Sequence, residues 1–221
     1  MWQTLFEELG PRGFVVIAVA MDSRPGDPAP WIEAAQPTYP TLIDREHRLA
    51  ELYHFVNVPQ AVWIDERGRI VRPAEPAGAY EAFRKMDRTT REMPQEAAHL
   101  AAHAKAAYLD AIRDWVHRDT ASAHVLDAGQ ARARLPLPTE DSARAHAMFR
   151  LGQFLLQRGD RVEGDRWLAE ASRLHPESWC IWRQRAGVTD LGLAAQPDFW
   201  ERVDALGERR YYARIEMPGM P

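Results

Sequence analysis

The sequence Val-Asn-Val-Pro-Gln-Ala-Val-Trp-Ile-Asp-Glu-Arg-Gly-Arg-Ile-Val, residues 56–71, decides the fold of the first part of the chain. Within it, Gln60–Ile64 is an apolar run that predicts a strand, and Asp65–Gly68 is a turn signal. Arg69–Arg72 then predicts an antiparallel return strand. Upstream, Phe14–Ala20 is apolar throughout and rich in valine, which is typical of a strand buried on both faces.

The elements around these strands give an α/β pattern followed by an all-α region. Before residue 56 we expect helices at Trp2–Leu9, Trp31–Ala35 and Glu46–Tyr53 and a short strand at Thr41–Ile43. After the hairpin we expect helices at Pro94–His117, Ser142–Gln157, Arg161–Leu174, Ser178–Ala186 and Pro197–Leu206. The fold class predicted is therefore α/β, with an incomplete central sheet, followed by an all-α helical domain.

Proline-rich stretches suggest the domain limits. Pro73–Gly78 is composed mainly of Pro, Gly and Ala and is expected to be a linker, and Leu135–Pro138 interrupts the chain again. These breaks predict an α/β domain over residues 1–78, a linker with one long helix over 79–138, and a helical domain over 139–221.

Composition excludes several classes of function. With 221 residues, a net charge of −4 and a pI near 6.1, the chain lacks the basic excess that a nucleic-acid-binding surface needs. The longest apolar run, Phe14–Met21, is too short to span a bilayer, and no signal-peptide pattern opens the sequence. The chain as written is therefore expected in the cytoplasm, and an extracytoplasmic location stays open if a signal or anchor precedes it.

Residues 13–72, about a third of the chain, resemble the redoxin branch of the thioredoxin superfamily. That branch contains the TlpA/ResA-type thiol–disulfide reductases and the related peroxiredoxins. The segments that carry the resemblance are Gly13–Asp22, Tyr39–Asp44, Leu49–Tyr53 with Val56–Pro59, and Val62–Asp65 with Gly68–Val71.

The resemblance implies a partner-binding site at Asn57, Val58 and Pro59. In the family, a cis-proline occupies the position of Pro59, and the backbone of the preceding residue pairs with an extended peptide. An ordinary trans proline is the alternative, since cis X-Pro bonds are uncommon.

The family's Cys-x-x-Cys pair and the strand before it have no counterpart here. The single cysteine, Cys180, lies in the helical half and is expected to be a buried, inert thiol. A shifted sheet, a strand donated by a partner chain or an incomplete gene start would each compensate for the missing strand, and we favour the last.

The helical half resembles a tetratricopeptide repeat. The family's spaced positions fall on Met148, Leu151, Gly152, Leu155, Gly164, Leu168, Ala171 and Pro176. Asp160 and Glu163 predict a capping box at the start of the second helix of the pair. The alternatives are a peptide-binding surface and a helical subdomain that simply packs on the first half.

Other candidate sites are weaker. His99 and His103 share one face of the long helix, but a solvated polar face is favoured over a zinc site. Asp22, Asp27, Asp44 and Asp65 lie at expected strand ends or loops and are interpreted as turn and cap formers. We therefore expect no catalytic residue, metal or cofactor.

Two functions follow from these observations. The first is a non-catalytic, thioredoxin-like interaction scaffold with a protein or peptide partner and a possible homodimer. The second is a thiol–disulfide oxidoreductase whose catalytic N-terminal segment is missing from this chain, which leaves open whether the chain belongs to an enzyme.

Overall fold

The structure is a computed structural model that describes residues 1–22, 28–190 and 192–221. By its internal contacts the chain divides into two units, each built from stretches far apart in the sequence. The first unit comprises Met1–Phe6, Val15–Val58 and Pro136–Glu201, and the second comprises Glu7–Phe14, Pro59–Leu135 and Arg202–Pro221. The predicted domain limits at residues 78 and 138 stay a prediction.

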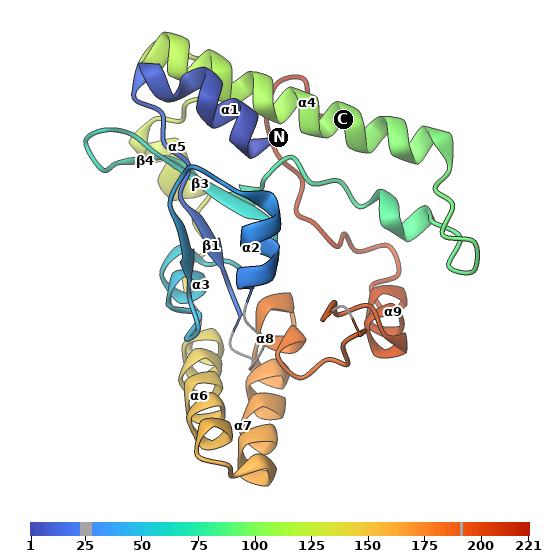
Figure 1. The fold of residues 1–221 in the computed structure, drawn as a ribbon. Helices are drawn as coiled ribbons and strands as arrows, with labels where there is room; N and C mark the ends of the chain where they lie inside the picture. Colours follow the sequence, from blue (N-terminus) through green and yellow to red (C-terminus); the bar gives the residue numbers. More distant parts are fainter. Residues whose placement is uncertain (23–27, 191) are drawn as a thin grey trace. The chain divides into compact units, whose positions relative to one another are not determined.

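Figure 1 shows the helices and strands of both units. The first unit contains β1 (Ala18–Ala20), α2 (Ala29–Ala35), β2 (Thr41–Ile43), α3 (Arg48–Tyr53), α6 (Glu140–Gln157), α7 (Arg161–Leu174) and α8 (Trp179–Arg183). The second contains the 3-10 helix η1 (Gly10–Arg12), β3 (Gln60–Ile64), β4 (Ile70–Pro76), η2 (Ala82–Lys85), α4 (Gln95–Arg118), η3 (Asp119–Ala121) and α5 (Ala128–Ala133). Helices α1 (Trp2–Leu9) and α9 (Pro197–Asp204) have residues in both units.

Strand β1 differs from the sequence-based prediction. Of the run Phe14–Ala20, only Ala18–Ala20 is a strand, and it pairs in parallel with β2, with Ala18 opposite Thr41. Val15 and Ile17 are 54% and 59% exposed, so the expectation of a strand buried on both faces was wrong. Such burial requires helices over both faces of a parallel sheet. Over the described ranges β1 pairs with β2 alone, and all three of its residues are half-buried.

The predicted hairpin forms from β3 and β4, which pair antiparallel with Trp63 opposite Arg72. Strand β4 extends through Pro76, so the expectation that Pro73–Gly78 is a linker was wrong for most of that stretch. Proline cannot donate to a ladder, but among the described residues β4 pairs with one strand, β3, so its other edge belongs to no ladder.

Arg72 is the most deeply buried charged residue of the second unit, at 1% exposure. Its guanidinium forms two hydrogen bonds to the Glu75 carboxylate, at 2.7 and 2.8 Å. The same group donates to the backbone carbonyls of His124 (2.8 Å) and Glu216 (3.2 Å). It also lies 5.5 Å from the centre of the Trp63 ring. One side chain thus joins the hairpin to two segments that are distant in sequence.

Aromatic packing joins the same hairpin to the long helix α4. The indole Nε1 of Trp63 donates to the hydroxyl of Tyr108 at 2.8 Å, and the ring of Trp115 stacks on Trp63 at 5.0 Å between centroids. Burial raises the pKa of Tyr108, which is 0% exposed, so its hydroxyl stays protonated. Ala104, Tyr108 and Ile112 recur every four residues on α4 and are buried, so they form the apolar face of this helix.

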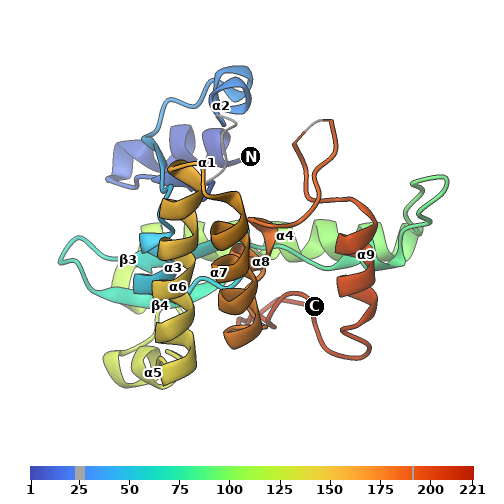
Figure 2. The ribbon, with the colours of Figure 1, turned by 90° about the horizontal axis from the view of Figure 1, so that it is seen from below.

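Helices α6 and α7 lie side by side in both ribbon views (Figures 1 and 2). Their closest approach is at Gly152 and Gly164. A Cβ at Gly152 would lie 2.9 Å from the backbone oxygen of Gly164, and a Cβ at Gly164 would lie 3.0 Å from the oxygen of Gly152. The predicted helical hairpin is therefore present, and its backbones are too close for any larger residue at the crossing.

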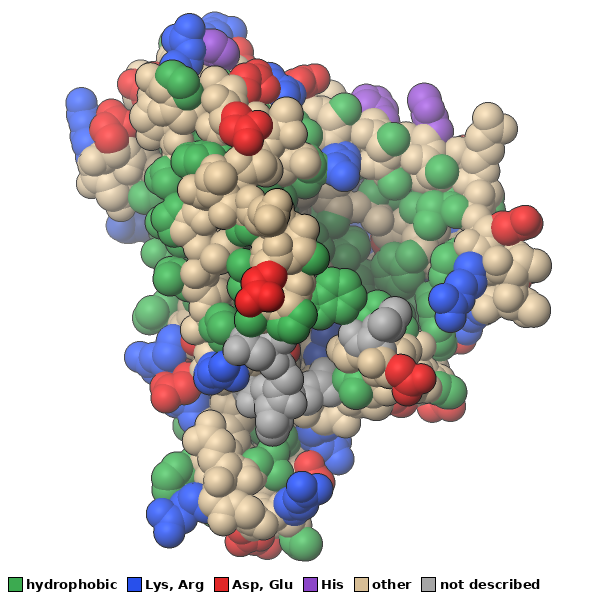
Figure 3. All heavy atoms as spheres, viewed as in Figure 1, with side chains coloured by type: hydrophobic (Ala, Val, Ile, Leu, Met, Phe, Trp, Pro, Cys, Tyr) green, Lys and Arg blue, Asp and Glu red, His purple; other side chains and the backbone are tan. Residues whose placement is uncertain are grey.

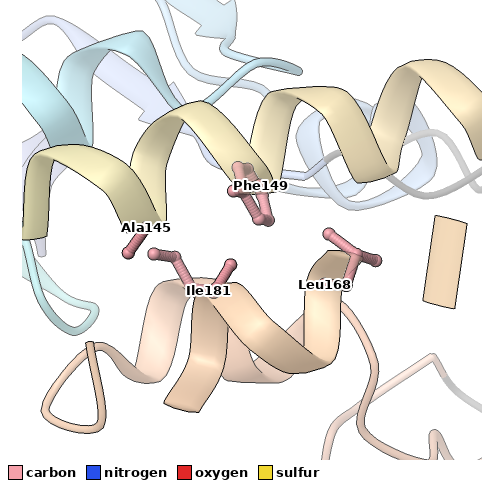
Figure 4. Packing of buried hydrophobic residues seen from close by; sticks show 5 residues of the cluster. Ala145, Phe149, Leu168 and Ile181 are labelled. Atoms are coloured by element: carbon pink, nitrogen blue, oxygen red, sulfur yellow. The ribbon is translucent and has the colours of Figure 1, made fainter. Parts of the chain in front are cut away.

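The core of this hairpin is small and apolar. Ala145 and Phe149 of α6 face Leu168 of α7 and Ile181 of α8, and all are at most 1% exposed (Figure 4). Ala171, which belongs to the same cluster, is also buried.

Caps fix the ends of the helices. The carboxylate of Asp160 accepts from the Glu163 amide at 3.2 Å, as predicted, but the Glu163 side chain pairs with Arg166. Helix α5 was not predicted, although a capping box of Asp127 and Gln130 marks its start. Helix α8 is shorter than the predicted Ser178–Ala186. None of the helices in the described parts of the chain is long and apolar enough to cross a membrane.

Replacing Gly152 with alanine should destabilise the first unit by about 1–3 kcal/mol, because the new methyl group meets a backbone oxygen that cannot move aside. Urea denaturation followed by circular dichroism measures the change. Gly129→Ala on α5, in the second unit, is the comparison: its Cβ would lie 3.2 Å from an oxygen of the Asp127 side chain and near no backbone atom, so the loss should be smaller. Equal stability of the two variants would contradict the close approach.

Candidate functional site

Asn57 and Val58 of the predicted site differ sharply in exposure. Asn57 is 3% exposed, and its Oδ1 accepts from the Val58 amide (2.9 Å) and from the Arg183 guanidinium (3.0 Å). The side chain of Val58 is 39% exposed. Asn57 is therefore a buried positioning residue, and Val58 presents an apolar surface to solvent.

Helix α8 holds the segment that precedes Val58. The carbonyl of Val56 accepts from the backbone amides of Trp179 (2.6 Å) and Cys180 (3.2 Å), which open α8. Ser178 caps the same helix by accepting from the Ile181 amide. The first amides of a helix lack partners within it, so the Val56 carbonyl satisfies groups that would otherwise be unpaired.

The role of Arg183 was not predicted. Its guanidinium donates to Asn57 and lies 5.8 Å from the centre of the Trp179 ring. The two partners are 126 residues apart in sequence, and no motif links them.

Pro59 is exposed, and its carbonyl accepts from the Ala77 amide at 3.3 Å within the second unit. This bond lies just beyond the Gln60–Pro76 pair of the hairpin, so Pro59 continues directly into β3. The cis isomer at Pro59 stays a prediction.

Cys180 is 4% exposed, which confirms the prediction of a buried thiol. Burial raises its pKa to about 12, against a smaller opposing effect of Arg183. The thiolate is the nucleophile in thiol–disulfide exchange, and at neutral pH almost none is present on Cys180.

Asp44 and Asp65, two of the four acidic candidates, act as cap and turn formers. The Asp44 carboxylate accepts from the amides of Arg48 (3.0 Å) and Leu49 (2.6 Å) at the start of α3. Asp65 accepts from the amides of Arg67 and Arg69 in the hairpin turn, and the Arg69 hydrogen bond lowers its pKa. Asp22 follows β1, and Asp27 lies outside the described residues.

His99 and His103 lie exposed on α4, where histidine side chains are visible on the surface (Figure 3). Over the described ranges, no group of three or more His, Cys, Asp or Glu residues could hold a metal ion. The pair therefore fits the solvated polar face that the sequence favoured.

A buried histidine of the first unit was not anticipated. His47 is 1% exposed, its ring lies 4.8 Å from that of Phe149, and neither ring nitrogen has a hydrogen-bond partner among the described residues. Its backbone has a φ of 52°, an uncommon conformation for a residue other than glycine. Nearby on α6, His146 is 8% exposed and lies 5.9 Å from His175 between ring centres.

Burial keeps these imidazoles neutral. It lowers the pKa of His47 to about 4, against an opposing effect of Asp44 and with a further decrease from His146. Burial, with His175 next, also lowers the pKa of His146 to about 4. The cluster therefore carries no charge at neutral pH and becomes costly once it is protonated.

The first unit should lose stability in acid. The unfolded chain protonates His47 near pH 6.5 and the folded protein only near pH 4. Between these values the unfolded state binds more protons, so the free energy of unfolding falls as the pH is lowered. The contribution of His47 is about 3 kcal/mol, at roughly 1.4 kcal/mol per pKa unit.

Urea denaturation between pH 7 and pH 4 measures this slope. His47→Asn, which removes one of the two rings whose pKa is lowered to about 4, should make the slope shallower, while His146 supplies the remainder. Gly152→Ala destabilises the same unit but keeps the ring, so it should lower stability by a constant amount at every pH. An unchanged slope in His47→Asn would contradict the role of His47.

Comparison with known proteins agrees with the geometry of the first 72 residues. A model of the AhpC/TSA family matches residues 2–72. No curated protein and no solved structure gives a significant match. The match covers β1, β2 and β3 together with the hairpin turn. Residues 2–72 are therefore similar to the AhpC/TSA family of thioredoxin-like redoxins.

Proposed function

We propose that this chain is a thioredoxin-like, redoxin-family protein that is non-catalytic as given and acts as a protein-interaction scaffold. The observation that carries the proposal is the state of Cys180. It is the one cysteine in 221 residues, it is buried, and its thiol stays protonated at neutral pH. Neither a dithiol pair nor a reactive thiolate is then available from these residues.

The proposed contact for a partner is the segment Asn57, Val58 and Pro59. An extended peptide would lie along the backbone here and pack an apolar side chain on the exposed Val58. To bond the Val58 amide, a peptide carbonyl must replace Oδ1 of Asn57. After that exchange Oδ1 of Asn57 still has a hydrogen-bond partner, because the Arg183 guanidinium remains as its second donor.

The α6–α7 hairpin supports a second interaction module of the tetratricopeptide type. Gly152 and Gly164 lie at the positions where such a repeat needs small residues, and the helices approach most closely there. Ala171 is buried in the seam, as the repeat pattern has it, and the buried Leu168 stands where that pattern has an aromatic residue.

Val58→Asp should weaken binding of extended peptides by about tenfold or more, because it places a charge in the apolar contact. Peptides selected from a random linear library with the wild-type protein supply the ligands, and fluorescence anisotropy measures their affinity. Val162→Asp is the matched control, since Val162 is 80% exposed on α7 and outside the segment. Equal affinity of the Val58 variant and the wild type would remove this segment from the proposal.

A thiol–disulfide oxidoreductase is the second candidate, and the match to the AhpC/TSA family favours it. One cysteine cannot form an intrachain disulfide, so this activity needs a second thiol from another polypeptide or from a segment outside these residues.

In an insulin-reduction assay with dithiothreitol, the chain should give no rate above the blank, and Cys180→Ser should behave in the same way. A rate that survives Cys180→Ser would show chemistry that the scaffold proposal does not contain. A rate that Cys180→Ser abolishes would contradict the inert state of the Cys180 thiol, on which the scaffold proposal rests.

A further inference from the structure

Helix α6 has an apolar face that the hairpin does not use. Its side chains Ala143, Ala147, Leu151 and Phe154, here called the outer stripe, are all exposed, with Leu151 at 39% and Phe154 at 52%. Their spacing of four, four and three residues places them on one side of the helix. The buried residues that face α7, such as Phe149, lie on another side.

The two halves of the outer stripe differ in size and charge. The first half has only methyl side chains, from Ala143 and Ala147, and the second has the larger Leu151 and Phe154. Glu140 lies in the first turn of the helix, whereas Arg158 caps its end with the guanidinium 5.6 Å from the centre of the Phe154 ring. The outer stripe therefore has small side chains and a negative charge at the N-terminal end of α6, and large side chains and a positive charge at its C-terminal end.

We propose that the outer stripe is the contact through which two copies of this chain associate, with the two α6 helices antiparallel about a two-fold axis. Centring the axis between Ala147 and Leu151 places each of them opposite the other in the second copy. Phe154 then faces Arg144, next to the small Ala143, and Arg158 faces Glu140. In this register the large Leu151 meets the small Ala147, and Phe154 meets the long, flexible side chain of Arg144. The positive charge of Arg158 meets the negative charge of Glu140.

We infer that the partner is a second copy of this chain, because the two halves of the outer stripe are complementary to each other in size and charge. A two-fold contact brings each surface against its own copy, so residue i meets residue j and residue j meets residue i. In a parallel arrangement each residue would face its own copy, so Glu140 would face Glu140 and the bulky Phe154 would face Phe154. The antiparallel arrangement also opposes the helix dipoles favourably. Asp141 already pairs with Arg144 within the helix at 3.7 Å, which leaves Glu140 as the acidic partner in this register.

One helix from each copy makes a small interface, so the dimer should be weak and depend on concentration. Sedimentation velocity of the full chain measures it, up to about 200 μM, where a micromolar Kd would populate the dimer. The wild type should shift from its monomer mass of 25.2 kDa toward twice that value. Phe154→Asp should raise the Kd about tenfold or more, whereas Val162→Asp, exposed on α7, should not.

Charge reversal tests the antiparallel register. Arg158→Glu alone should weaken the dimer, and Glu140→Arg with Arg158→Glu should restore it, because the opposed pair is remade with its signs exchanged. The substituted residues Glu140, Phe154, Arg158 and Val162 are all exposed. Circular dichroism checks that each variant is folded. A wild type that stays monomeric throughout would overturn the proposal and leave the stripe to a different protein. Dimerisation unaffected by Phe154→Asp, or no rescue in the double variant, would overturn it as well. None of these outcomes depends on peptide binding at Val58, so the two proposals fail or stand separately.

Discussion

Arg72 puts a full positive charge inside the second unit, and the segments around it supply what that charge requires. Burying an ion removes its hydration, and the loss is tolerable only when the ion is paired and its donors are bonded. Glu75 supplies the pairing, the carbonyls of His124 and Glu216 bond further donors, and the Trp63 ring covers one face. The hairpin, the loop after α4 and the C-terminal tail are thus held by one guanidinium. Loss of any one of these partners would leave the charge poorly compensated.

Local signals made most of the helices predictable, although the short α5 was missed. The bounds of α1 and α7 were predicted without error, because each shows a helical repeat of apolar residues and an end marked by proline, glycine or aspartate. The burial of β1 was not predictable from its own residues, because burial depends on neighbouring strands that a single run of valines does not specify. Strand β4 continues past Pro73 for a related reason: proline excludes a central strand but not an edge.

At the candidate site, too, the local sequence could not predict which side chains would contact one another. The sequence pointed to Asn57, Val58 and Pro59 but not to what holds them. Arg183 reaches Asn57 across 126 residues, and only the folded backbone brings the two together. His47 is a similar case, since its isolation depends on Phe149, about a hundred residues later in the chain. Local pattern finds helices and turns, whereas buried polar partners are set by the tertiary structure.

The crossing of α6 and α7 limits how this hairpin can change over evolution. At most packed positions a larger residue on one helix can be accommodated by a smaller one on the other. At Gly152 the opposing group is the backbone oxygen of Gly164, and at Gly164 it includes the oxygen of Gly152. Every residue has the same main-chain carbonyl, so no second mutation at the opposing position can make room for a larger side chain. Gly152 and Gly164 are therefore expected to remain fixed as a pair, whereas packed positions that meet only side chains can change together.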